Sequence, residues 1–315
     1  MPWTMDDYLY YIIKQTKKHN IDNVTRTNAY QKFYFTYPEI QWTLVATIVS
    51  RNAGWNMTDL YLPPYKDMLG TSERIRLFMT YERANWLIFS DTYPQLLVYQ
   101  LSLSRNEPMF HLLDSLHVSH FMKKEWEHFW TYKNKQRLMD ALIINEQHVI
   151  ERPVVQQPFF KQRVFKSLPY ILQNYFMMNA VLVPTTSKRV YGKFVHGFTN
   201  VHKRIMFGKQ IAAIIYSPKI YQQAVDFLLT VSHTGSRRDY EQFLNVNLPQ
   251  SPILRLSYPA ITHHDEIRND WAKCKNIKKK WFSPLKRIKI CEMSSRFYLK
   301  RHLLYAYSHM KRIFS

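Results

Sequence analysis

The chain has 315 residues, 46% hydrophobic and 16% aromatic, which is enough to bury a substantial core. Its net charge of +21 points to an anionic partner: nucleic acid, a membrane surface or a phosphate-bearing molecule. Glycine is scarce, and neither G-x-G-x-x-G nor G-x-x-x-x-G-K occurs, which excludes the usual phosphate-binding loops of nucleotide-binding folds.

The basic charge is concentrated in the second half of the chain. Residues 1–157 carry 17 Lys and Arg against 16 Asp and Glu, whereas residues 158–315 carry 27 against 7. We therefore expect the anionic partner to contact the second half. The expected contact surface comprises the basic residues Lys278, Lys279, Lys280, Lys286, Arg287 and Lys289.

No sequence feature indicates a metal or a cofactor. The two cysteines, Cys274 and Cys291, lack metal-ligand spacing, and no H-E-x-x-H motif occurs. The chain begins with acidic residues where a signal peptide would carry basic ones. We expect a cytoplasmic protein that binds neither a metal nor a cofactor.

The N-terminal part predicts helices with recognisable starts. Thr4 and Asp22 suit the N-cap positions of helices over 4–19 and from 22 to about 35. Pro38 suits a first helical position, and residues 40–49 are almost entirely apolar. This pattern predicts a buried helix that ends near Gly54, because glycine is a common helix terminator.

Helical periodicity continues to residue 150. The predicted segments are 71–89, 94–103, 108–117, a segment after Ser119, and 136–150. Pro153 and Pro158 mark a hinge where the charge changes. We expect one compact helical body over 1–315, with 1–152 near-neutral and 153–315 strongly basic as possible halves.

The uncharged segment 167–187 is the nearest match to a membrane span. Pro169, Pro184 and three amide side chains interrupt it, so it predicts a buried helix over 169–180 and an extended piece at 181–183. Further helices are expected at 207–216, 217–231 and 293–314, the last with basic and apolar residues only partly segregated. The predicted fold class is all-α, a multi-helix globular bundle with little or no β-structure and no transmembrane segment.

A first polar cluster follows the buried helix. Arg51 and Asn52 come at its end, beside Trp55 and Asp59. Buried polar groups are costly unless they are paired. One interpretation is an internal lock, in which Arg51 and Asn52 bond loop carbonyls or Arg51 pairs with Asp59. The other is a ligand-binding corner.

A second cluster is HTGSRRDYE at 233–241, where Gly235 would end one helix and Ser236 would cap the next. It is either an anion site or an ordinary cap in which an arginine pairs with Asp59 or another carboxylate. We hypothesise that both clusters meet in one polar site between the halves. The candidate residues of the second cluster are His233, Ser236, Arg237, Arg238, Asp239 and Tyr240.

Two further segments carry histidines. His196 and His202 lie in 191–209, where basic and aromatic residues alternate as in sites for single-stranded nucleic acid, although the composition also suits an ordinary basic face. His263 and His264 precede two acidic residues, but adjacent side chains of a helix point in different directions. They do not predict a metal site.

SRNAGWNMTDL at 50–60, TRTNAYQKFYFTYPEI before it and HTGSRRDYE resemble the bacterial YppC-like family, whose function is unknown. The resemblance implies no activity. The hypothesis from the residues is a binding protein for nucleic acid or a phosphate-bearing ligand. The alternatives are an enzyme whose site combines Arg51 and Asn52 with 233–241, and a peripheral membrane protein held by the basic tail.

Overall fold

The computed structural model describes residues 3–167, 170–171, 179–264, 269–273, 277–285, 288 and 290–314. The protein is predominantly α-helical, with a small two-stranded sheet, which confirms the predicted fold class. The helices are α1 (Met5–His19), α2 (Asn23–Thr36), α3 (Trp42–Asp59), α4 (Pro63–Met68), α5 (Thr71–Arg105), α6 (Leu112–Ser115), α7 (His120–Tyr132), α8 (Lys135–Val149), α9 (Pro158–Phe160), α11 (Val201–Ile215), α12 (Tyr221–Thr230), α13 (Arg238–Glu241), α14 (Leu254–Ser257) and α15 (Ser294–Phe314). Short π-helical segments η1 (Glu151–Val155) and η2 (Lys161–Phe165) flank α9, and η3 (Lys279–Trp281) is a 3₁₀ turn.

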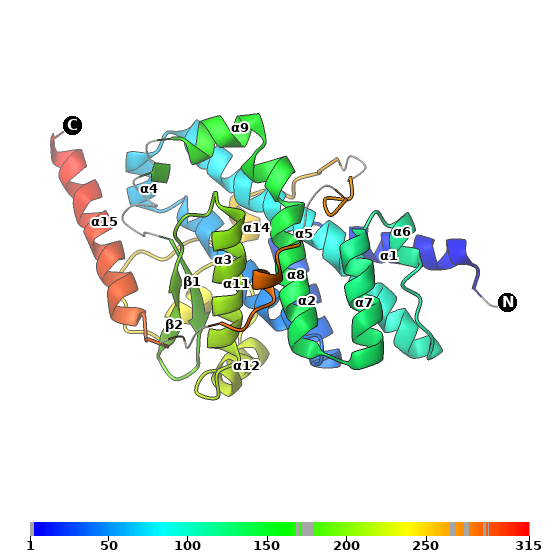
Figure 1. Ribbon diagram of the computed structural model, residues 1–315. Coiled ribbons are helices and arrows are strands. Elements are labelled where there is room, and N and C mark those ends of the chain that lie inside the picture. The colour runs from blue at the N-terminus through cyan, green and yellow to red at the C-terminus, as the bar shows by residue number, and fades with distance from the viewer. Residues whose placement is uncertain are drawn as a thin grey trace.

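Helix α3 is the central element, in agreement with its apolar sequence. It packs against α2, α5, α8, α11 and strand β1 (Ala180–Pro184). Trp42 and Trp55 on α3 are almost completely buried. The surrounding apolar cluster includes side chains from Tyr8 to Tyr298, so both parts of the chain contribute to it. Figure 1 shows α1 and α15 at opposite ends of the molecule.

Several helix boundaries predicted from glycine and proline were wrong. Helix α3 begins at Trp42 and not at Pro38, and α6 begins at Leu112 and not at Pro108. Helix α3 continues through Gly54, and α5 continues through Pro94. A Cβ atom on Gly54 would lie 2.4 Å from Asn23 Oδ1 and 3.2 Å from the Gly235 Cα, so this glycine permits close approach instead of ending the helix. Around Pro94 α5 is buried, and packing outweighs the roughly 3 kcal/mol that an internal proline costs a helix.

The sheet pairs β1 with β2 (Val190–Phe194) in antiparallel register, Ala180 opposite Phe194. The predicted extended piece at 181–183 lies within β1. A Cβ atom on Gly192 would lie 2.1 Å from the Val181 carbonyl oxygen, and its φ of +142° also favours glycine. The predicted helix over 169–180 falls largely outside the described residues.

The predicted proline hinge is part of a packed helical segment. Pro153 lies in η1 and Pro158 begins α9. Val154 and Val155 pack with Trp86 and Leu87 of α5 in a second apolar cluster. The segment therefore forms one wall of the space between α5, α8 and α11.

Candidate functional site

The two polar clusters lie against each other. Trp55 Nε1 donates to Asp239 Oδ2 at 3.1 Å, and the Thr58 hydroxyl donates to the Gly235 carbonyl at 2.8 Å. The polar residues of α3 that contact the 233–241 segment are three or four positions apart and therefore lie on one side of the helix. They contact the segment along its length. We call this contact between α3 and residues 231–241 the junction.

The strongest contact of the junction is an ion pair. Arg237 Nε donates to Asp59 Oδ2 at 2.6 Å, and the two side chains are 3% and 6% exposed. The same guanidinium donates to Asn56 Oδ1 at 2.8 Å and to the Tyr240 hydroxyl at 3.1 Å. The sequence left open whether Asp59 pairs with Arg51 or with an arginine of the second cluster, and in the structure it pairs with Arg237.

His233 and Asp239 form a second buried pair. His233 Nδ1 lies 3.2 Å from Asp239 Oδ2, and Nε2 lies 2.9 Å from Asn23 Oδ1. Burial lowers the pKa of His233, while the Asp239 carboxylate acts in the opposite direction. Asp239 also accepts from the Thr234 backbone and hydroxyl, and its pKa is lowered by hydrogen bonds and the nearby imidazole despite its burial. The pair fixes the start of the 233–241 segment.

Arg51 is buried without a carboxylate in hydrogen-bond contact among the described residues. Its Nη2 donates to Gln31 Oε1 at 2.9 Å and to the Val231 carbonyl at 2.8 Å, and its guanidinium lies 5.5 Å from the Phe227 ring centre. Burial lowers its pKa to about 10. Its contacts join α2 and α3 to the end of α12, as the lock interpretation expects.

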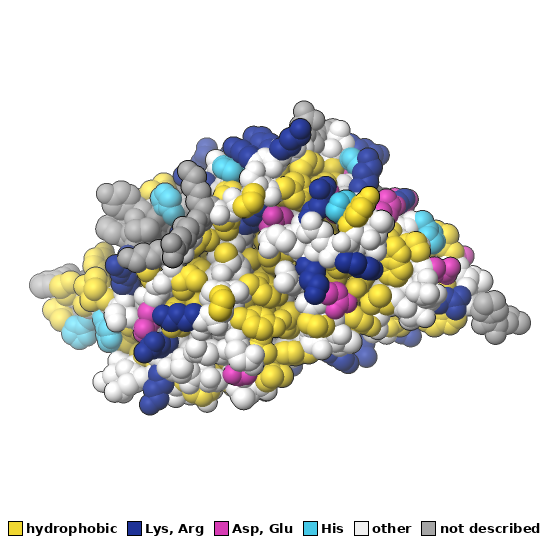
Figure 2. All heavy atoms as spheres, turned by 60° about the horizontal axis from the view of Figure 1, so that its bottom comes forward, with side chains coloured by type: hydrophobic (Ala, Val, Ile, Leu, Met, Phe, Trp, Pro, Cys, Tyr) yellow, Lys and Arg dark blue, Asp and Glu magenta, His cyan; other side chains and the backbone are white. Residues whose placement is uncertain are grey.

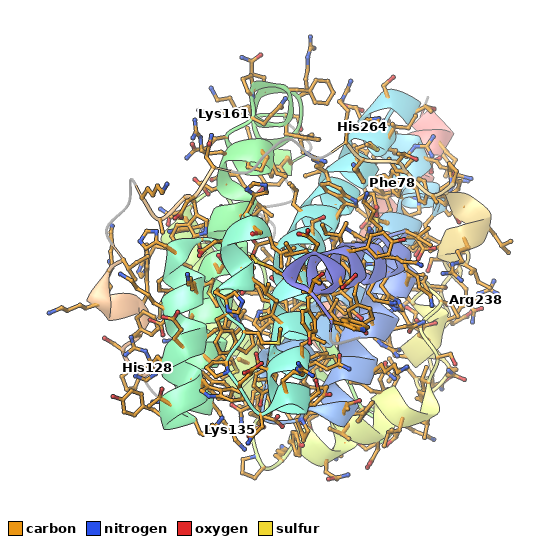
Figure 3. The ribbon with its side chains drawn as sticks, turned by 90° about the vertical axis from the view of Figure 1, so that its right-hand side faces the viewer. Phe78, His128, Lys135, Lys161, Arg238 and His264 are labelled. Carbon is orange, nitrogen blue, oxygen red and sulfur yellow. The ribbon has the colours of Figure 1, made fainter. Side chains whose placement is uncertain are left out.

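Asn52 has a different structural role. Its Nδ2 donates to the Leu182 carbonyl at 2.8 Å, and its Oδ1 accepts from the Leu182 backbone N–H at 2.8 Å. It therefore holds the middle of β1 to the centre of α3. Of the other candidates, Ser236 donates to the Ser251 carbonyl, and Arg238 is exposed at the periphery of the molecule (Figure 3).

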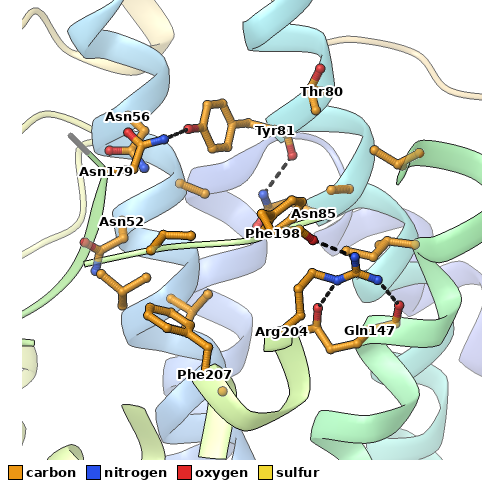
Figure 4. Close-up of a pocket in the computed structure, with 18 of the residues that line it drawn as sticks. Asn52, Asn56, Thr80, Tyr81, Asn85, Gln147, Asn179, Phe198, Arg204 and Phe207 are labelled. Atoms are coloured by element: carbon orange, nitrogen blue, oxygen red, sulfur yellow. Dashed lines mark hydrogen bonds between the residues drawn. The ribbon is translucent and has the colours of Figure 1, made fainter. Parts of the chain in front are cut away.

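A cavity of about 230 Å³ lies on the other side of α3 (Figure 4). Helices α3, α5, α8 and α11, the η1 and η2 segments and β1 form its walls. Most of the lining is aliphatic or aromatic, which gives a ligand apolar surroundings. The lining includes Val45, Val49, Leu77, Ala84, Ile88, Ile150, Val154, Val164, Phe165, Val181, Phe207 and Ile211.

Glu146 of α8 lines the cavity, and its carboxyl group has unusual surroundings. Its oxygens accept from Trp42 Nε1 at 3.1 Å and from Gln147 Nε2 at 2.8 Å, and both donors are neutral. Burial raises the pKa of Glu146 to about 7. The side chain is only partly covered, because it borders the cavity. A carboxyl of this kind suits proton transfer or the binding of an amine.

Two further polar groups border the cavity on opposite sides (Figure 4). Arg204 of α11 bonds both the side chain and the backbone of Gln147, and it pairs with Glu151. On the other side Asn179 Nδ2 donates to the Tyr81 hydroxyl at 3.4 Å. The cavity thus has an apolar middle and polar ends.

The structure separates the remaining predicted site residues from the junction. His196 is exposed and borders the cavity, and His202 Nδ1 accepts from Trp281 Nε1 at 3.1 Å. Lys278, Lys279 and Lys280 are exposed on and beside η3. Lys286, Arg287 and Lys289 lie outside the described residues.

The described residues contain no group of three or more His, Cys, Asp or Glu side chains placed to hold a metal ion. Within the same residues, no helix has the length and apolarity needed to traverse a bilayer.

A family model described as a protein of unknown function, DUF2515, matches residues 18–302, which include the junction and the cavity. The chain belongs to this family. It is also 45% identical over 298 residues to the uncharacterized protein YppC of Bacillus subtilis strain 168, covering 94% of this chain and 92% of that protein. The resemblance seen in the sequence blocks is thereby confirmed. No solved structure matches the chain.

Sequence reasoning missed Glu146, Gln147 and Arg204. The available signal was the polar run Asn145-Glu146-Gln147, which follows the apolar stretch 141–144 of the predicted helix. Buried polar runs of this kind need partners or a role. The run was not singled out because its neighbours, Trp42 and α11, are distant in sequence.

Proposed function

We propose that this DUF2515 protein binds a small, largely apolar ligand with an amine or hydrogen-bonding head group in the cavity beside Glu146. The observation that carries the proposal is a carboxyl with neutral donors and a pKa of about 7 next to about 230 Å³ of apolar space. A cavity of roughly 150 Å³ with apolar walls already binds benzene.

The head group follows from the charge of Glu146. Transfer of an unpaired carboxylate into an apolar site is costly, and a ligand ammonium group offsets that cost. When protonated, the same carboxyl donates a hydrogen bond to a carbonyl. The geometry therefore also accommodates an enzyme in which Glu146 acts as general acid or base on the bound molecule.

Toluene and benzylamine test the proposal, because they have the same ring and differ in the cationic head. We expect both to bind by calorimetry or ligand-observed NMR, with benzylamine tighter near pH 8, where Glu146 is ionised. Ala84→Leu, which fills the cavity, should weaken both by at least about tenfold. The matched control is Ala213→Leu on the exposed face of α11.

Glu146→Gln should weaken benzylamine more than toluene. If neither probe binds, or if Ala84→Leu leaves both affinities unchanged, the cavity is not the site.

A second candidate function is contact with an anionic partner through the exposed lysines of η3. Trp281 is 3% exposed, and its carbonyl accepts from the buried Lys209 Nζ at 2.7 Å. This contact anchors η3, so that Lys278, Lys279 and Lys280 are presented from a fixed position. Replacing all three lysines with Gln should weaken binding to single-stranded DNA or RNA and reduce its salt dependence. Equal affinity and salt slope in the variant would remove η3 from consideration.

A further inference from the structure

The outer face of α15 carries a continuous row of exposed apolar side chains. Their positions are separated by four, four, three and three residues, which places them on one side of an α-helix. Each is at least half exposed. The row, called here the outer stripe, consists of Leu299 at 60%, Leu303 at 60%, Tyr307 at 54%, Met310 at 52% and Ile313 at 64%.

Polar contacts on the inner face fix the rotation of α15. Arg301 Nη1 donates to Glu241 Oε1 at 2.6 Å, and the Tyr298 hydroxyl donates to the same oxygen at 3.1 Å. Nearer the C-terminus, Ser308 and Arg312 both donate to the Asp67 carboxylate. Because these bonds lie along the whole helix, the outer stripe is held facing away from the body.

The two faces also explain why the sequence of α15 is not clearly amphipathic. Phe297 and Tyr298 are buried against the body, whereas Leu303 and Tyr307 are exposed on the other side. A helical wheel superimposes both apolar faces and the basic residues between them. The structure assigns one face to the protein core and leaves the other uncovered.

The charge of α15 selects among possible occupants of the stripe. The helix contains no Asp or Glu, and Arg296 is exposed on the same side of the helix as the stripe. Lys300 lies over the Phe194 ring and Lys311 donates to the Asp67 carbonyl, so these two lysines contact the body. A second copy of the helix would bring like charges together, whereas an anionic surface complements them. An exposed apolar row beside basic residues is the pattern of helices that lie in the membrane interface.

We propose that α15 docks the protein onto an anionic lipid bilayer. The outer stripe enters the boundary between headgroups and acyl chains, and Arg296 contacts a lipid phosphate. The helix forms one end of the molecule (Figure 1), and hydrophobic and histidine side chains lie together on the surface there (Figure 2). The inference does not depend on the cavity. It identifies a lipid bilayer as the anionic partner of the second candidate function.

The test is flotation of the full chain with vesicles of phosphatidylcholine alone or with about 30% phosphatidylglycerol. We expect binding to the anionic vesicles at least about tenfold stronger than to neutral ones, and weaker binding at high salt. The double variant Leu303→Ser/Met310→Ser should lose at least about tenfold of this binding. Its melting temperature should stay near that of the wild type, since both residues are exposed.

The control removes two exposed leucines elsewhere. Leu229 and Leu256 are 64% and 84% exposed, and Leu229→Ser/Leu256→Ser should bind vesicles as the wild type does. Arg296→Gln should weaken binding and reduce its salt dependence. Each of these results supports docking through α15.

Three results overturn the inference. One is no vesicle binding by the wild type, and another is unchanged binding by the stripe variant. In that second case, if the Lys278→Gln/Lys279→Gln/Lys280→Gln variant does lose vesicle binding, the protein still binds an anionic partner, but through η3 and not through α15. The third is a wild-type dimer in sedimentation that the stripe variant converts to monomer without any vesicle binding, which assigns the stripe to a second copy of the chain.

Discussion

The junction and the cavity are two polar regions on different sides of α3, and they differ in how their charges are satisfied. In the junction Arg237 pairs with Asp59, and Asp239 lies beside His233. At the cavity Glu146 receives hydrogen bonds from two neutral groups and borders open space. The two pairs of the junction are satisfied within the protein, whereas Glu146 leaves a charge that a ligand can compensate.

This difference separates structural polar residues from candidate functional ones. Residues of the junction looked functional in the sequence because they are densely charged. In the structure Arg237 is paired with Asp59 and His233 with Asp239, so removal of one partner leaves a buried group without its counterpart. Glu146 looked ordinary in the sequence, yet its raised pKa and its position make it the better candidate for chemistry.

The largest expected effect comes from breaking the ion pair of the junction. Asp59→Ala leaves the buried guanidinium of Arg237 without its carboxylate and should destabilise the protein by about 3–5 kcal/mol in urea denaturation. Asp114→Ala is the matched control, since Asp114 pairs with Lys123 at 2.5 Å on the surface and should cost under about 1 kcal/mol. Similar losses in both variants would contradict the structural role of the junction.

A pH series tests the cavity. The pKa of Glu146 is raised from 4.5 to about 7, so the folded protein binds this proton more tightly than the unfolded chain does. The contribution of Glu146 to stability is full below pH 4.5 and is lost as pH rises to about 7, by up to about 3 kcal/mol. Glu146→Gln should remove this loss, which is measured as the difference in unfolding free energy between wild type and variant from pH 5 to pH 8.

Glu127 provides the control, since it is exposed on α7. Glu127→Gln should leave the pH dependence as it is in the wild type. Parallel curves for wild type and Glu146→Gln would mean that the cavity carboxyl has an ordinary pKa, and the proposed head-group chemistry would lose its basis.

Side-chain N-caps in the sequence predicted helix starts well, whereas prolines did not. Thr4, Asp22 and Ser119 each accept a backbone N–H bond at the start of the expected helix, because capping involves residues only three positions apart. Gly54 was misread because its role depends on Asn23 and Gly235, which local sequence does not relate to it.

The candidate site was less accessible to sequence reasoning for the same physical reason. Charge density marks the 233–241 segment, but density does not show whether the charges satisfy one another. The pKa of Glu146 arises from Trp42, the apolar walls and the empty space beside it, and these come from distant segments. Residues 158–315 carry 27 of the 44 Lys and Arg residues, yet Arg204, Lys209, Arg237 and Arg301 are buried and do not contribute to an outer basic surface.

Asn52 belongs to neither region alone, because it borders the cavity and also holds β1 to α3 through the Leu182 backbone. Asn52→Ala removes two hydrogen bonds to the backbone of Leu182 and should cost about 2 kcal/mol. Hydrogen exchange of the Leu182 amide should become faster, whereas Asn28→Ala, at an exposed position of α2, should leave it unchanged. Unaltered protection at Leu182 would show that the strand does not depend on this contact.

The smallest expected effect is the coupling between the two arginines of the junction. Arg51 bonds Gln31 and the Val231 carbonyl, whereas Arg237 bonds Asp59 and its own set of neutral partners. Since the two arginines share no hydrogen-bond partner among the residues that the structure describes, the stability losses of Arg51→Gln and Arg237→Lys should add to within about 0.5 kcal/mol in the double variant. Lys at 237 keeps a charge opposite Asp59, so the variant stays folded enough for urea denaturation. A double variant that is more stable than the sum predicts by over about 1 kcal/mol would instead place both guanidinium groups in one network, as a joint site of the two sequence blocks requires.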